Sequence, residues 1–176
     1  MNSKYEISTK ENREFLKASC EELLNFGHRF PSPNGGSYYL GDDGTPWKDR
    51  NRETWITCRM AHVYSLGLML GHEGSGELAD AALKGLKGEL HDEKNGGWYA
   101  GVTPEGDIVP NKQCYAHAFV ILAASSALTA GRPGAKELLE EALAVYDRHF
   151  WNEEEGLACD TWNTAVSYTH LTLPTH

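Results

Sequence analysis

The sequence predicts an all-α protein, an incomplete (α/α)6 toroid built of helical hairpins that are joined by short β-hairpin loops. The 176-residue chain repeats itself at a spacing of 60 positions. Each repeat holds two segments with helical hydrophobic spacing, and aromatic-rich stretches connect successive hairpins. Such hairpins are longer than tetratricopeptide or HEAT units, and a closed ring of about six would need roughly 360 residues. We therefore expect about two and a half hairpins here.

The repeat is clearest, and free of gaps, from Gly71 to Gly96, which align with Gly131 to Gly156. Eight of these 26 positions are identical, whereas chance would give about one or two. The two stretches are therefore expected to be copies of one helical unit.

The first unit is predicted to contain an inner helix followed by an outer one. Trp55 to Leu70 carries apolar residues at steps of three and four, and Gly71 is suited to ending that helix. The segment from about Gly76 to Leu90 has leucines on one face and charges on the others, which is typical of a helix that is half exposed.

The second unit repeats this scheme. Gln113 to Ala130 is almost wholly apolar or small, and Pro133 to Phe150 is amphipathic. A preceding outer helix is predicted over Glu14 to Phe26, capped by Gly27. The connections between units are expected to form β-hairpins that turn at Asp43-Gly44 and at Pro104-Glu105-Gly106.

The repeat stops near Ala165. We expect residues 1–165 to be the amino-terminal part of a toroid catalytic domain, and residues 166–176 to be a non-native or read-through tail. The alternative for the tail is a short carboxyl-terminal strand.

Composition restricts the possible partners. The chain has 25 acidic and 16 basic residues and a formal net charge of −9, which argues against nucleic acid or an anionic membrane as a partner. The longest apolar stretch, Ala116 to Ala124, is too short to span a bilayer, and the absence of a signal peptide makes the cytoplasm the default location. The four dispersed cysteines are expected to be buried thiols, not zinc ligands or disulfides: Cys20, Cys58, Cys114 and Cys159.

One face of the first inner helix carries the candidate site. Trp55, Arg59 and His62 follow one another at i, i+4 and i+7, and Tyr115 has the register position of Trp55 in the second unit. Aromatic faces that stack on sugar rings, together with a guanidinium that donates to their oxygens, indicate carbohydrate binding.

Structural roles are the alternatives for these residues. Arg59 could form an ion pair with Glu53 or Asp92, and His62 could be a hydrogen-bonded core histidine. Because Tyr115 and His117 lie on different faces of one helix, only one of them can point into the cavity, and we expect Tyr115.

Three segments together resemble the N-acylglucosamine 2-epimerase superfamily, nearest its mannose and sulfoquinovose aldose-ketose isomerases. They are Thr54 to Tyr64, Gly96 to Tyr99, and Lys112 to Phe119. The resemblance implies an (α/α)6 barrel that isomerises a monosaccharide through an enediolate without a metal or other cofactor, and that can form homo-oligomers at full length. It also implies that Arg59 stabilises the developing charge and that Trp55 and Tyr115 contact the sugar, with His62 as a further candidate for substrate binding.

The family's paired catalytic histidines belong to later hairpins, and no histidine of this chain matches them. We therefore predict that the chain by itself lacks isomerase activity. A sugar 2-epimerase is the nearest alternative function. A toroid glycoside hydrolase would need two carboxylates across a sugar subsite, and a helical-repeat binding scaffold would not need Arg59.

Overall fold

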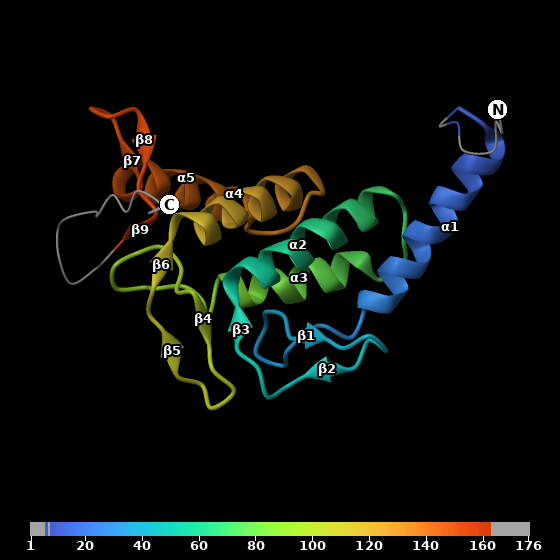
Figure 1. Ribbon diagram of the computed structural model, residues 1–176, viewed down its shortest axis with the longest axis horizontal. Helices are drawn as coiled ribbons and strands as arrows, with labels where there is room; N and C mark the ends of the chain where they lie inside the picture. Colours follow the sequence, from blue (N-terminus) through green and yellow to red (C-terminus); the bar gives the residue numbers. More distant parts are fainter. Residues whose placement is uncertain (1–5, 7, 163–176) are drawn as a thin grey trace, which may run out of the picture.

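The computed structural model describes residue 6 and residues 8–162 (Figure 1). This part of the chain forms five helices: α1 (Lys10–Gly27), α2 (Thr54–Met69), α3 (Ser75–Leu86), α4 (Cys114–Thr129) and α5 (Ala135–His149). It also forms strands of two residues each: β1 (Tyr39–Leu40), β2 (Pro46–Trp47), β3 (Arg52–Glu53), β4 (Gly101–Val102), β5 (Ile108–Val109), β6 (Lys112–Gln113), β7 (Trp151–Asn152), β8 (Leu157–Ala158) and β9 (Thr161–Trp162). The predicted tail, residues 166–176, lies outside the described residues.

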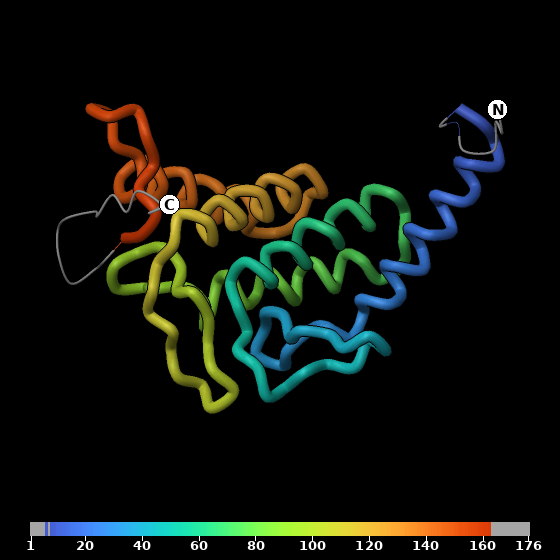
Figure 2. The backbone as a smooth tube through the Cα atoms, in the orientation of Figure 1, coloured from blue at the N-terminus to red at the C-terminus, as the bar shows by residue number. Residues whose placement is uncertain are grey.

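The helices form two layers. The inner helices α2 and α4 pack side by side, α3 packs on α2, and α5 packs on α4. The carboxyl-terminal end of α1 reaches α2, while the rest of α1 projects away from the other helices (Figures 1 and 2). The short strands gather where the inner helices begin, so the loops between hairpins lie at one end of the helix layers.

The 60-residue repeat is realised in three dimensions. Strand β3 pairs with β4 and β6 pairs with β9 in the same register, with Arg52 opposite Val102 and Lys112 opposite Trp162. Both inner helices end in the same way, because Gly71 and Gly131 adopt positive φ angles of 82° and 69°. The amide of each glycine bonds back to the carbonyl two residues before the helix cap, at 3.0 and 2.9 Å, as in a Schellman motif.

Small residues predominate at the buried positions of α2 and α4, the two inner helices that meet along a seam. The side chains buried along these two helices include Cys58, Ala61, Ala123, Ala124 and Ala127. Small side chains allow the two helix backbones to approach closely, which fixes how the exposed residues at the edges of the seam meet.

Several expected helix boundaries were wrong. Helix α3 ends at Leu86 instead of Leu90, since Gly85 and Gly88 weaken the helix and the amide of Leu90 turns back to the Gly85 carbonyl at 3.2 Å. Helix α5 runs only over Ala135–His149, and α1 starts earlier than expected, at Lys10. There the side chain of Thr9 accepts a hydrogen bond from the Asn12 amide at 3.3 Å and caps the helix.

The assignment of Gly27 as a helix cap was also wrong, because Gly27 is the last helical residue and His28 follows it as the cap. What Gly27 provides is space: a Cβ at this position would lie 2.5 Å from the hydroxyl of Tyr64. That hydroxyl donates to the Leu24 carbonyl at 2.8 Å and so ties α1 to α2.

The cysteines are only partly as expected. Cys58 and Cys159 are buried, but Cys20 is exposed and Cys114 is half-buried.

Candidate functional site

Trp55, Arg59 and Tyr115 come together at the amino-terminal ends of the inner helices. The ring centroids of Trp55 and Tyr115 are 6.1 Å apart. Phe119, one turn further along α4, lies 5.0 Å from Tyr115 and 6.5 Å from Trp55 between ring centroids. Tyr115 remains 51% exposed, so this aromatic cluster is open to a ligand.

The guanidinium of Arg59 is held by aromatic faces. Its Cζ atom lies 4.7 Å from the centroid of Trp55 and 5.1 Å from that of Phe119, within the range of cation–π contacts. Arg59 is exposed, and among the described residues no protein acceptor takes its N–H groups. The aromatic faces therefore hold the side chain, while its donors have no acceptor among residues 8–162.

The alternative of an ion pair between Arg59 and Glu53 or Asp92 was wrong, because among the described residues Arg59 forms no ion pair with either carboxylate. Asp92 accepts from Lys112 Nζ at 2.7 Å, and hydrogen bonds from Lys112 and Asn95 outweigh burial to hold the pKa of the Asp92 carboxyl well below its usual range. Glu53 Oε2 accepts from Trp55 Nε1 at 2.7 Å and also from the hydroxyl of Tyr39.

Tyr39 and Phe119 also belong to this cluster, although neither was predicted as a site residue. Phe119 could have been found, since the 60-residue register places it where Arg59 lies in the first unit. Tyr39 comes from the loop before α2, and its ring centroid lies 6.5 Å from that of Trp55. Burial, followed by the hydrogen bond to Glu53 and its charge, raises the pKa of Tyr39 above its ordinary value, so its hydroxyl keeps its proton.

His62 lies further along the same face of α2 and contacts the seam instead of the aromatic cluster. Its Nδ1 lies 2.6 Å from Ser126 Oγ. Ser126 Oγ donates to the Leu122 carbonyl at 2.9 Å, so it accepts from His62 and Nδ1 carries the proton. A substrate contact by His62 stays a prediction.

Lys112 and His117 are buried parts of the scaffold. The ammonium of Lys112 is buried against Asp92 and lies 4.2 Å from the ring centroid of Trp162. His117 Nδ1 donates to the Gln113 carbonyl at 2.8 Å and Nε2 accepts from the Trp98 amide at 3.1 Å. Tyr115 is thus the exposed member of the Tyr115 and His117 pair.

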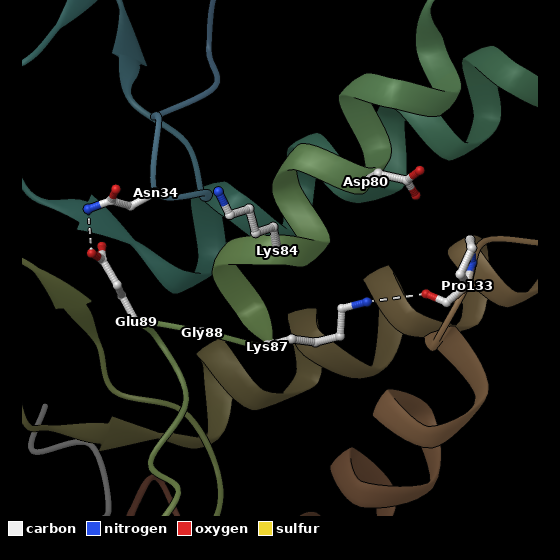
Figure 3. A pocket seen from close by; sticks show the side chains of 7 residues that line it. All are labelled: Asn34, Asp80, Lys84, Lys87, Gly88, Glu89 and Pro133. Atoms are coloured by element: carbon white, nitrogen blue, oxygen red, sulfur yellow. Dashed lines mark hydrogen bonds between the residues drawn. The ribbon is translucent and has the colours of Figure 1, made fainter.

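A groove of about 700 Å³ lies elsewhere, beside α3 (Figure 3). Its lysines already have partners: Lys84 Nζ donates to the Pro33 carbonyl at 2.9 Å, and Lys87 Nζ donates to the Pro133 carbonyl at 3.2 Å. Asn34 Nδ2 donates to Glu89 at 2.7 Å. These hydrogen bonds link neighbouring loops to one another, so the groove offers few free donors to a ligand.

The model for the N-acylglucosamine 2-epimerase (GlcNAc 2-epimerase) family matches residues 35–173. The chain belongs to this family. Among its relatives, a D-mannose isomerase of Thermobifida fusca is 40% identical over 155 residues, which are 88% of this chain and 38% of that protein. A D-mannose isomerase of Pseudomonas cannabina is 37% identical over 150 residues, 85% of this chain and 36% of that protein.

Solved structures agree on the fold. A crystal structure of a D-mannose isomerase matches with a TM-score of 0.80 at 23% identity, over 94% of this chain and 42% of that one. A cellobiose 2-epimerase from Bacillus thermoamylovorans matches with a TM-score of 0.75 at 24% identity, over 86% of this chain and 41% of that one. The chain thus spans about two fifths of the length of the proteins it resembles.

None of the helices in residues 8–162 is long and apolar enough to cross a bilayer. Within the same residues, no three His, Cys, Asp or Glu side chains gather closely enough to hold a metal ion.

Proposed function

We propose that this chain is the substrate-binding part of a sugar isomerase that interconverts aldose and ketose forms of mannose-like hexoses. The observation that carries the proposal is the position of Arg59: its guanidinium lies over the rings of Trp55 and Phe119 and has donors that no described residue accepts. Sugar rings stack on aromatic faces while their oxygens accept hydrogen bonds, and this surface supplies both contacts.

The chemistry assigns Arg59 an electrophilic role. Isomerisation removes the C2 proton of the open-chain sugar and leaves an enediolate, whose negative charge is stabilised by a positioned cation. Arginine stays protonated throughout and donates from a planar fork, which suits an enediolate with two neighbouring oxygens. Trp55 and Tyr115 hold the sugar against this cation, and His62 contacts the sugar further along α2.

The base that removes the proton is not among the site residues described here. His117 is buried, and both of its ring nitrogens are hydrogen-bonded within the scaffold. His62, whose Nδ1–H donates to Ser126 Oγ, is assigned a substrate contact and not the role of the base, since the family resemblance places the catalytic histidines in later hairpins. We propose that the chain binds the sugar but does not turn it over by itself.

Mannose-like substrates are favoured because the relatives that are 40% and 37% identical are D-mannose isomerases. A 2-epimerase is the second candidate, favoured by the family model and by the cellobiose 2-epimerase structures. The two reactions share the enediolate and differ in whether the proton returns to C1 or C2, so the product distinguishes them.

Binding of D-mannose to the 176-residue chain, followed by saturation-transfer NMR and tryptophan fluorescence, tests the proposal. Arg59→Ala is expected to weaken binding by about tenfold or more, because a hydrogen bond to a charged group is worth about 1.5–3 kcal/mol. Arg148→Ala, which removes an exposed arginine of α5, is the matched control. Equal affinity of the Arg59→Ala variant and the unmodified chain would remove Arg59 from the site.

A further inference from the structure

Glu53 occupies an unusual place at the start of α2. It is the N-cap residue of this helix, yet its side chain caps no backbone amide. The carboxylate instead accepts hydrogen bonds from Trp55 Nε1 at 2.7 Å and from the hydroxyl of Tyr39. A residue type that commonly stabilises helix starts is thus used to hold two aromatic side chains of the site.

Both of these hydrogen bonds end on the same oxygen, Oε2. The second oxygen of Glu53, Oε1, has no partner among the described residues. No buried side-chain oxygen or nitrogen in the described part of the chain lacks a partner, so Oε1 is open to solvent. A carboxylate oxygen left free in this way is a strong acceptor.

The carboxylate of Glu53 and the guanidinium of Arg59 both lie against the indole ring of Trp55. Glu53 bonds the edge of Trp55 at Nε1, whereas the guanidinium of Arg59 lies over its face, 4.7 Å from the ring centroid. The two charged groups do not form an ion pair: among the described residues, the nitrogens of Arg59 come within 4.0 Å of no carboxylate. A ligand that stacks near Trp55 therefore meets an acceptor and a set of donors.

This combination fits a polyhydroxylated ligand, because each hydroxyl group can donate one hydrogen bond and accept others. We propose that Glu53 is a substrate-binding residue whose Oε1 accepts a hydrogen bond from a sugar hydroxyl, while Oε2 holds Trp55 and Tyr39 in place. The inference rests on the proposed function, since it assumes that the ligand is a sugar. It assigns to Glu53 a selective role: recognition of one hydroxyl.

The alternative is that Glu53 only ties the β1–β2 loop to α2. Two substitutions separate the roles. In Glu53→Gln the amide oxygen can still accept from Trp55 and Tyr39, and the Trp55 N–H orients the amide so that its NH2 group replaces Oε1. Tyr39→Phe removes one of the two ties and leaves Oε1 unchanged, which makes it the matched control.

The experiment measures binding of D-mannose and of its monodeoxy analogues to the 176-residue chain. Glu53→Gln is expected to weaken mannose binding by about tenfold, as for the loss of a charge-assisted hydrogen bond, and Tyr39→Phe by less than about threefold. One deoxy analogue should bind the unmodified chain more weakly than mannose does, and Glu53→Gln should abolish that difference, which a purely structural tie would not do.

The outcomes distinguish the two proposals. If the unmodified chain binds mannose but Glu53→Gln binds it equally well, or loses affinity for mannose and every analogue in parallel, the role of Glu53 is overturned and the proposed function stands. A Tyr39→Phe variant that loses as much affinity as Glu53→Gln also overturns the role of Glu53. If the unmodified chain binds no mannose, the proposed function fails and this inference fails with it.

Discussion

Mild acid is expected to destabilise the protein through His117. This side chain is wholly buried, and its neutral form is matched to its surroundings, since Nδ1 donates to the Gln113 carbonyl and Nε2 accepts from the Trp98 amide. If Nε2 were protonated, its N–H would point at the N–H of Trp98, and the hydrogen bond between them would be lost. The ring of Phe150, with its centroid 4.7 Å away, leaves little room for water.

Burial, together with the nearby charges of Lys112 and His149, lowers the pKa of His117 from 6.5 to about 4. Because the folded pKa is depressed, the unfolded chain takes up the proton first as the pH falls. Stability is therefore lost as the pH falls from about 6.5 to about 4, and this gap corresponds to about 3 kcal/mol. Burial also lowers the pKa of His149, which adds to the loss with the same sign.

Urea unfolding followed by tryptophan fluorescence, at several pH values between 7 and 4 and at constant ionic strength, measures this loss. His117→Gln places an amide oxygen near the position of Nε2, where it can accept from Trp98, but it cannot titrate. The variant should be less stable at pH 7 and should lose about 3 kcal/mol less than the unmodified chain as the pH falls. If His117→Gln kept the full pH dependence, the assignment to His117 would be wrong.

Three further predictions follow from buried contacts and from the site. Asp92→Asn should destabilise the fold by about 3–5 kcal/mol, because it leaves the buried ammonium of Lys112 without its counter-ion. Asp80→Asn, in the more exposed pair with Arg132, is the control and should cost about 1 kcal/mol or less. Urea unfolding measures both free energies, and similar losses for the two variants would contradict the reasoning. Gly85→Ala should destabilise the fold despite the better helix propensity of alanine, since its Cβ would lie 2.3 Å from the Gly36 amide nitrogen. Gly76→Ala is the control, because its Cβ meets only the flexible end of Arg132 at 3.2 Å. Thermal unfolding measures both variants, and a Gly85→Ala melting temperature at or above that of the unmodified chain would contradict this account. Trp55→Ala should remove measurable mannose binding without changing the far-UV circular dichroism spectrum, since the indole supports both Arg59 and the stacked sugar; retained binding would show that the sugar lies elsewhere.

The repeat made part of the site predictable. A shift of 60 positions relates α2 to α4 residue by residue, and neighbouring inner helices bring equivalent positions together, so the approach of Trp55 and Tyr115 could be expected. The same shift does not show how far one helix slides along the other. His62 meets Ser126, 64 positions later, so side chains on α2 also reach the next turn of α4.

Other contacts depend on tertiary packing that no periodic pattern encodes. Tyr39 approaches Trp55 only because the β1–β2 loop folds back toward the start of α2. The end of α3 depends on the close passage of Gly36 against Gly85. Lys112 lies next to a predicted helix start, where exposure is the usual expectation, but the loop at Asp92 and the ring of Trp162 cover it.

In the proposed function, the surface that binds the sugar is formed by equivalent positions that change chemistry between the repeats, and the identical positions build the scaffold. The residues shared by both units, such as Gly71 and Gly131, end helices in the same way and so build the same scaffold twice. Arg52 and Lys112 differ but do the same thing, since each is a buried cation that pairs with a carboxylate.

The residues of the aromatic cluster, in contrast, differ in chemistry between the two units. Trp55 and Arg59 in the first unit correspond to Tyr115 and Phe119 in the second, and the guanidinium of one unit lies over the ring that replaces it in the other. A ligand bound between two repeats meets both units at once, so unlike groups at equivalent positions give it a donor from one side and an apolar face from the other. The loss of mannose binding expected for Arg59→Ala should therefore not be restored by placing an arginine at position 119, because that change would supply the guanidinium and remove the ring that holds it.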